Sequence, residues 1–305
     1  PEEIIVGGVY GNGQFRLAAI DPAQLTFTHI TDAAAVESPL AVDTSLTEVY
    51  WNSLNGQPLP ATLQEAREYA DRLGGRYGVT ILLSAQAQEA CDAVWDATIT
   101  TTDQWPLEDE PHAIARMLEA LDRTLALYPD GFFRQMKNTM GEGGVRFMPV
   151  GHIENAVNAI GLTYETYGWQ NIYIDVTIDA FDGTICHEIW HAIEGVLLTR
   201  NWDAINQEEW AACNPAGFSY NEDAETPDSN PERWTFFYEF SAQDVYFVDA
   251  YSRTNAKEDR ARIMEYIMAT EDVAGARVQS PAIAQKLQIM CRAIRENFDT
   301  SSWGE

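Results

Sequence analysis

The sequence has little positive charge. It carries 19 Lys and Arg against 47 Asp and Glu, a formal net charge of −28 over 305 residues, and its only lysines are Lys137, Lys257 and Lys286. A surface so rich in carboxylates repels phosphate groups. Nucleic acids and anionic membranes are therefore excluded as expected partners.

Long apolar runs and paired cysteines are also absent. No uninterrupted apolar stretch approaches the roughly 20 residues that cross a bilayer, which predicts a soluble protein without membrane insertion. Cys91, Cys186, Cys213 and Cys291 form no Cys-x-x-Cys pair, which excludes a zinc ribbon and a thioredoxin-type redox centre. Two disulfides and four free buried thiols both stay open. Because the sequence starts at Pro1 without Met, we expect a secreted or surface-anchored protein whose leader precedes this residue.

The first 60 residues have the pattern of a β-rich region. Ile4–Tyr10 and Phe15–Ile20 are apolar runs joined by Gly11-Asn12-Gly13-Gln14, and Asn-Gly is a strong hairpin signal. Leu25–Ile30 predicts a third strand. We therefore expect a β-rich region over residues 1–60 and a second domain over residues 61–305.

The second domain begins with a helix signal. Thr62 and Glu65 form a capping box, which predicts a helix through Leu73 that Gly74-Gly75 ends.

The elements that follow are strands and helices in irregular order. Apolar runs predict strands at Val79–Leu83, Val145–Val150 and Asn171–Ile178. Apolar residues at helical spacing predict helices within residues 111–128, after Asp182 and from Ser280-Pro281 onward. This order favours an α+β domain over a parallel α/β sheet.

His187, Glu188 and His191 form the pattern His-Glu-x-x-His, abbreviated HExxH, within a helical apolar stripe. Residues four apart on a helix lie on one face, about 5–6 Å apart at Cβ, so both imidazoles can reach one Zn²⁺. Glu188 would lie beside the metal as general base for a water whose pKa the metal lowers. The pattern predicts a zinc site rather than two ordinary histidines.

A catalytic zinc site needs a third protein ligand. Glu194 and Leu197 stand where the metzincin pattern needs Gly and His, which excludes that class. The remaining candidates are downstream acids, among which position alone does not choose: Glu208, Glu209, Glu222, Glu225, Glu239, Glu258, Asp259 and Glu265.

The run Tyr-Ser-Arg-Thr-Asn-Ala-Lys-Glu, from Tyr251 to Glu258, resembles the segment of anthrax lethal factor and related zinc peptidases that carries their third ligand. Trp210, Asn214-Pro215 and residues 217–220 are similar to the preceding link in bacterial zinc-binding metallopeptidases. The resemblance implies that Glu258 is the zinc ligand and Tyr251 a catalytic residue.

Each of these two residues also has a structural interpretation. Glu258 stands three residues after Asn255, as the acid of a helix cap does. Tyr251 follows an aromatic stretch, which favours core packing.

The resemblance implies a zincin-like α+β domain, in which the HExxH helix lies beneath a small mixed sheet and the C-terminal part is helical. One residue departs from the pattern, because relatives have an acid four positions after the ligand and this chain has Arg262. The group that accepts from the other N–H of a histidine ligand would then be Asp259, Glu194, Glu265 or a backbone oxygen.

The expected function is that of a gluzincin-type zinc endopeptidase. We expect a peptide or protein substrate to add along an edge strand, either Val145–Val150 or Asn171–Ile178. The alternative is a surface binding module that keeps zinc without catalysis, which Arg262 favours.

Overall fold

The structure is a computed structural model. It describes residues 4–9, 15–21, 26–30, 59–90, 97–100, 113–138, 140–155, 159–177, 181–220, 245–269 and 280–301. The chain divides into two units, residues 1–57 and 58–305. The domain boundary predicted at residue 60 stays a prediction.

The described residues of the first unit form one antiparallel sheet. Its strands are β1 (Ile4–Val9), β2 (Phe15–Asp21) and β3 (Thr26–Ile30), in the order β1-β2-β3. Val9 pairs with Phe15, as a hairpin requires. All three strands were predicted, whereas the turn residues 10–14 lie outside the described residues.

The second unit opens with α2 (Leu63–Tyr77), which has the predicted capping box at Thr62. The predicted end at Gly74-Gly75 is wrong, because both glycines lie inside the helix. Gly78, at φ 80°, ends it with a left-handed cap. Glycine costs a helix about 1 kcal/mol. It is needed at 74, because a Cβ there would stand 2.8 Å from the backbone oxygen of Val79.

The central sheet is small and mixed. Its strands are β4 (Thr80–Ile81), β6 (Gly144–Val150), β9 (Trp169–Asp175) and β8 (Gly161–Thr166), in the order β4-β6-β9-β8. β6 is parallel to β4 and β9, and β8 is antiparallel to β9. β8 was not predicted. Two further strands, β5 (Ala97–Thr100) and β7 (His152–Asn155), pair with each other.

Both faces of this sheet are covered, which explains why β9 is buried along most of its length. Ile172 and Ile174 face a large core that includes residues of α2, α4 (Ala113–Leu125) and α5 (Phe181–Arg200). Tyr173 points to a smaller core with residues of β7 and α3 (Ala85–Ala90).

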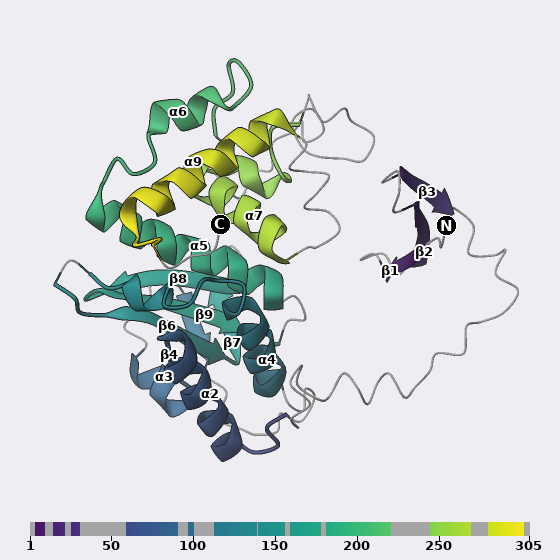
Figure 1. The fold of residues 1–305 in the computed structure, drawn as a ribbon. Coiled ribbons are helices and arrows are strands. Elements are labelled where there is room, and N and C mark those ends of the chain that lie inside the picture. The colour runs from purple at the N-terminus through teal and green to yellow at the C-terminus, as the bar shows by residue number, and fades with distance from the viewer. Residues whose placement is uncertain are drawn as a thin grey trace, which may run out of the picture. The chain divides into compact units, whose positions relative to one another are not determined.

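The C-terminal half is helical, as predicted. Its described residues contain α6 (Gln207–Ala212), the 3-10 turn η5 (Tyr251–Arg253), α7 (Ala256–Ala269) and α9 (Pro281–Asn297). Another 3-10 turn, η2 (Phe133–Gln135), follows α4 in the first half of the chain. α5 lies between the sheet on one side and α7 and α9 on the other (Figure 1).

The structure also bears on two predictions, one on the cysteines and one on membrane spans. Cys186, Cys213 and Cys291 are free thiols, which contradicts the alternative with two disulfides; Cys91 is outside the described residues. Within the described part of the chain, no helix is both long and apolar enough to pass through a membrane. Secretion stays a prediction.

Candidate active site

The three HExxH residues lie on α5, near the middle of the helix. Ile185, Ile189 and the other apolar residues around them are buried, because the sheet and α7 cover two sides of the helix. His187 and Glu188 are buried as well, at 9% and 5% exposure. The tertiary fold therefore places polar side chains where their charge is poorly solvated.

Glu258 comes from the first turn of α7. Asn255 caps this helix, since its Oδ1 accepts from the backbone N–H groups of Lys257 and Glu258 at 2.9 and 3.0 Å. The Glu258 carboxylate turns toward the histidines instead of back to the cap. Asn255 therefore is a helix cap, but the Glu258 carboxylate does not take part in it, and its role as a metal ligand stays a prediction.

His187, His191 and Glu258 form a cluster whose ligand atoms lie within 4.8 Å of one another. The Nε2 atoms of the two histidines are 3.1 Å apart, and Glu258 Oε2 is 3.0 Å from His187 Nε2 and 3.5 Å from His191 Nε2. Ligands about 2.05 Å from a tetrahedral zinc are separated by roughly 3.3 Å. The three atoms therefore fit the vertices of one tetrahedral face.

The outer nitrogen of His187 is also held. Its Nδ1 lies 3.2 Å from Glu265 Oε2, and a carboxylate there keeps the proton on Nδ1 and the Nε2 lone pair free for a metal. Glu265 was one of the predicted candidates for orienting a histidine ligand. Glu194, another candidate, is paired with Arg260 and Trp190 instead.

The acids surrounding His187 give the site a negative potential. Burial lowers the pKa of His187, but the hydrogen bonds to Glu258 and Glu265 outweigh it and raise the pKa to about 10. Burial raises the pKa of Glu258, whereas hydrogen bonds to His187 and His191 bring it well below its usual value. A potential that favours a proton on an imidazole also favours a metal cation in its place.

Glu188 contacts the edge strand β8. The hydroxyl Oγ1 of Thr163 lies 2.7 Å from Glu188 Oε2 and 3.0 Å from the backbone oxygen of Glu188. A Cβ at Gly161 would stand 2.7 Å from Glu188 Oε1, so glycine is what lets the carboxylate approach the strand. Sequence reasoning missed both residues. The alternation of Leu162 and Tyr164 with Thr163 and Glu165 was a weak signal for the strand.

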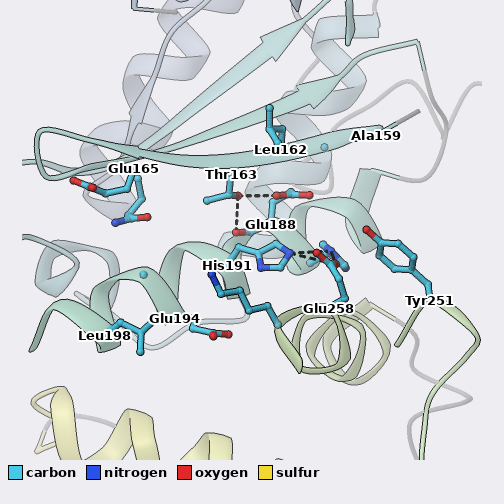
Figure 2. Close-up of a pocket in the computed structure, with 15 residues that line it drawn as sticks. Ala159, Leu162, Thr163, Glu165, Glu188, His191, Glu194, Leu198, Tyr251 and Glu258 are labelled. Carbon is cyan, nitrogen blue, oxygen red and sulfur yellow. Dashed lines mark hydrogen bonds and ion pairs between the residues drawn. The ribbon is translucent and has the colours of Figure 1, made fainter. Parts of the chain in front are cut away.

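These side chains line a cavity of about 430 Å³ between β8 and α5. Figure 2 shows Glu188, His191 and Glu258 projecting into its middle, with Tyr251 at one end and Glu165 and Leu198 at the other. A second cavity of about 480 Å³ continues from it and shares Glu194, Leu198, Lys257 and Glu258.

Tyr251 is 48% exposed, so its ring is not a core residue. The ring centroid lies 6.2 Å from that of His187. Burial, with the nearby Glu258 and Glu188, raises the pKa of the Tyr251 phenol, which therefore keeps its proton at neutral pH.

The other candidate ligands lie elsewhere or have other partners. Glu208 is on α6, Glu209 pairs with Arg292, and Asp259 pairs with Lys286. Glu222, Glu225 and Glu239 are outside the described residues.

No protein-family model matches the chain, and no curated protein matches it significantly. Among solved structures, the chain is similar to a protein from Bacteroides caccae described as a "putative zinc-binding metallo-peptidase". The two share 14% sequence identity with a TM-score of 0.42, over 78% of this chain and 88% of that one. Likeness of this degree assigns neither a family nor an activity.

Proposed function

We propose that this protein is a zinc-dependent endopeptidase. The observation that carries the proposal is the cluster of His187, His191 and Glu258, with the Glu188 carboxylate beside it in a cleft under an edge strand. The distances between these side chains support the proposal without reference to the resemblance in the sequence.

The donor set fits zinc. Two imidazole nitrogens and one carboxylate oxygen are the ligands of many catalytic zinc sites, which keep a fourth position for water or substrate. When bound, zinc supplies a Lewis acid that polarises a carbonyl group and lowers the pKa of water.

Glu188 is the general base of the proposal. It follows the ligand His187 directly and faces the same cavity, so its carboxylate can take a proton from water and later give it to the leaving amine. Thr163 and Gly161 hold this carboxylate against β8.

Tyr251 is the proposed hydrogen-bond donor to the reacting carbonyl oxygen. It lines the same cavity as Glu188, and its raised pKa keeps the phenol protonated. A donor aimed at the oxygen where negative charge develops stabilises the transition state.

The substrate is proposed to add to β8. The expected positions were wrong, because β9 is paired on both sides and β6 lies between β4 and β9. β8 is the edge strand next to the cleft, and main-chain hydrogen bonds to it would hold an extended peptide across the cluster. The second cavity extends this path past the cluster, which suits cleavage within a chain.

The alternative, a zinc-containing binding module without catalysis, predicts the same ligands but no turnover. Arg262 was the feature in its favour. The structure gives Arg262 carboxylate partners and gives His187 a different acid, so this residue does not count against catalysis.

The test is metal analysis together with mass-spectrometric cleavage profiling on a broad peptide library, for wild type and Glu188→Gln. We expect one zinc in both proteins and turnover lowered by about 10²–10⁴ in the variant. Zinc in wild type without cleavage would support the binding module. Equal cleavage by the two proteins would refute the assignment of Glu188.

A further inference from the structure

Arg262 lies one helical turn after Glu258 on α7 and is four-fifths buried beside the cleft. Its guanidinium reaches two carboxylates that belong to different parts of the fold. Nε donates to Asp249 Oδ2 at 2.8 Å, Nη2 contacts the same oxygen, and Nη1 donates to Glu265 Oε2. These ion pairs raise the pKa of Arg262 although burial opposes this, so the cation is permanent.

Asp249 connects Arg262 to the turn that carries Tyr251. The other oxygen of this carboxylate, Oδ1, accepts from the backbone N–H of Ser252 at 2.9 Å and from its hydroxyl at 3.1 Å. Asp249 therefore fixes the 3-10 turn η5 from within. Holding Asp249 in place holds the position of the phenol.

Glu265 connects Arg262 to the metal cluster. The same oxygen that accepts from Arg262, Oε2, faces Nδ1 of His187. Gly183 of α5 gives the carboxylate room, since a Cβ there would lie 3.1 Å from Glu265 Oε1. Rotation of Glu265 away from His187 would break its contact with Arg262.

We propose that Arg262 is a positioning residue that couples the turn of Tyr251 to the ligand His187. It touches none of the three ligand atoms and acts through Asp249 and Glu265. Without the cation, two carboxylates would face each other in a partly buried space, and each would be free to turn away from the group it orients. The inference rests on the proposed function, because it gives Tyr251 and His187 their roles.

The geometry also explains the acid that this chain lacks. Relatives of the resembled family have a carboxylate at the position of Arg262, and here Glu265, one turn later, contacts His187 instead. Glu265 and Arg262 therefore act together: Glu265 contacts His187, and Arg262 contacts Glu265. A glutamate placed at 262 would face Asp249 and Glu265 and repel both.

The experiment compares Arg262→Met, Arg262→Lys and Arg262→Glu with wild type in the full chain. The readouts are the zinc dissociation constant from chelator competition, the visible spectrum of the cobalt-substituted protein, and thermal unfolding without metal. Arg292→Met is the matched control, because it removes the same charge from a surface ion pair with Glu209, remote from the cluster.

We expect Arg262→Met to weaken zinc binding about 10–100-fold, as loss of an outer partner of a metal ligand does, and to change the cobalt spectrum. Arg262→Lys should restore part of the affinity, because a lysine can pair with one carboxylate but not bridge two in a fixed fork. Arg262→Glu should bind zinc worst. Arg292→Met should match wild type in all readouts.

Wild-type zinc affinity and an unchanged cobalt spectrum in both Arg262→Met and Arg262→Lys would overturn the inference. So would an equal loss in Arg292→Met. If Arg262→Met does not fold, Arg262→Lys decides, because an unaltered spectrum there excludes positioning through the fork. A wild type that binds cobalt but cleaves no peptide would refute the peptidase and leave the metal-site readouts of Arg262 standing.

Discussion

Consecutive residues of α7 belong to two clusters of opposite character. Glu258 belongs to the open cluster, defined by His187, His191 and Glu258, which lines the cleft. Asp259 and Arg260 belong to the sealed cluster, named for charges that pair within the protein: Asp259 pairs with Lys286 of α9 and Arg260 with Glu194 of α5. Glu194 and Arg260 also line the cavities, but their charged groups are held by each other.

In the sealed cluster, each charge has an opposite charge beside it. Lys286 Nζ lies 2.7 Å from Asp259 Oδ2, which also accepts from the Tyr220 hydroxyl at 2.8 Å. Arg260 and Glu194 form a two-point pair at 2.9 and 2.5 Å. Burial raises the pKa of Asp259 and lowers that of Lys286, so only pairing keeps these groups charged.

In the open cluster, Glu258 also faces a positive charge, because the raised pKa of His187 makes its imidazole a cation at neutral pH when no metal is bound. An imidazolium can lose its proton and then bind a metal ion, whereas the guanidinium and ammonium groups of the sealed cluster are not metal ligands. Within the described residues, buried charge on its own therefore does not distinguish a binding site from a structural pair. What distinguishes the open cluster is a proton that a metal ion can replace.

The largest effect is expected from His191→Ala, which breaks the open cluster. Loss of one of three ligands should weaken zinc binding by more than about 100-fold, beyond the effect of an outer partner. The unfolding free energy of the metal-free protein should change by less than about 1 kcal/mol, because His191 is partly exposed. Chelator competition and denaturant unfolding measure the two. Retained zinc affinity would contradict the assignment of this ligand.

The converse effect is expected from Lys286→Met, which breaks the sealed cluster. Leaving Asp259 buried without its partner should destabilise the protein by about 3–5 kcal/mol. The double variant Lys286→Met/Asp259→Leu should recover most of this, since it leaves no unpaired charge. Denaturant unfolding of the metal-free protein measures both. If the single and double variants are equally unstable, the instability comes from lost side-chain packing between α9 and α7 and not from the unpaired charge of Asp259.

The stability that the open cluster contributes should depend on pH, because the pKa of its His187 is raised. The pKa of His187 is raised from 6.5 to about 10, so its contribution to stability is complete below pH 6.5 and is lost as the pH rises to about 10. The difference in unfolding free energy between metal-free wild type and His187→Gln should therefore shrink by up to a few kcal/mol over this range. A difference that grows with pH would show that His187 is not stabilised as a cation.

The smallest effect concerns the base beside the open cluster. Thr163→Val removes the hydroxyl that faces Glu188 and should lower turnover about tenfold, the loss of one hydrogen bond to a charged group. Zinc affinity should not change. Thr163→Ser should behave like wild type, because it keeps the hydroxyl. Activity of the valine variant equal to that of wild type would remove Thr163 from the proposed mechanism.

The pair of histidines could be predicted because their relation is local. Any helix places residues 187 and 191 on one face, so a five-residue pattern was enough to bring the two side chains together. The capping box of Thr62 and Glu65 and the hairpin strands were predictable for the same reason. Gly74 of α2 was misread because the close approach of Val79, rather than local propensity, decides its place, whereas nothing in the described structure requires the glycine at 75.

The third ligand could not be chosen from residue types, since eight downstream acids were candidates and position alone did not select one of them. The resemblance selected Glu258, and the structure brings it to His187 across a separation of 71 residues. The roles of Glu265 and Glu194 were open, and the sequence did not show that Arg262 contacts both Asp249 and Glu265. β8 went unpredicted because its tight turn to β9 uses Tyr167 at φ 50° beside Gly168, a backbone state that tyrosine seldom adopts.

The sequence by itself determined the two imidazoles, the adjacent glutamate and the acidic surface, because each depends only on composition or on spacing within one helical turn. Tertiary structure alone decided which acid meets the histidines, which strand borders the cleft and which charges are paired. These depend on how α5, α7 and the sheet pack, and side chains distant in the sequence become neighbours only through that packing.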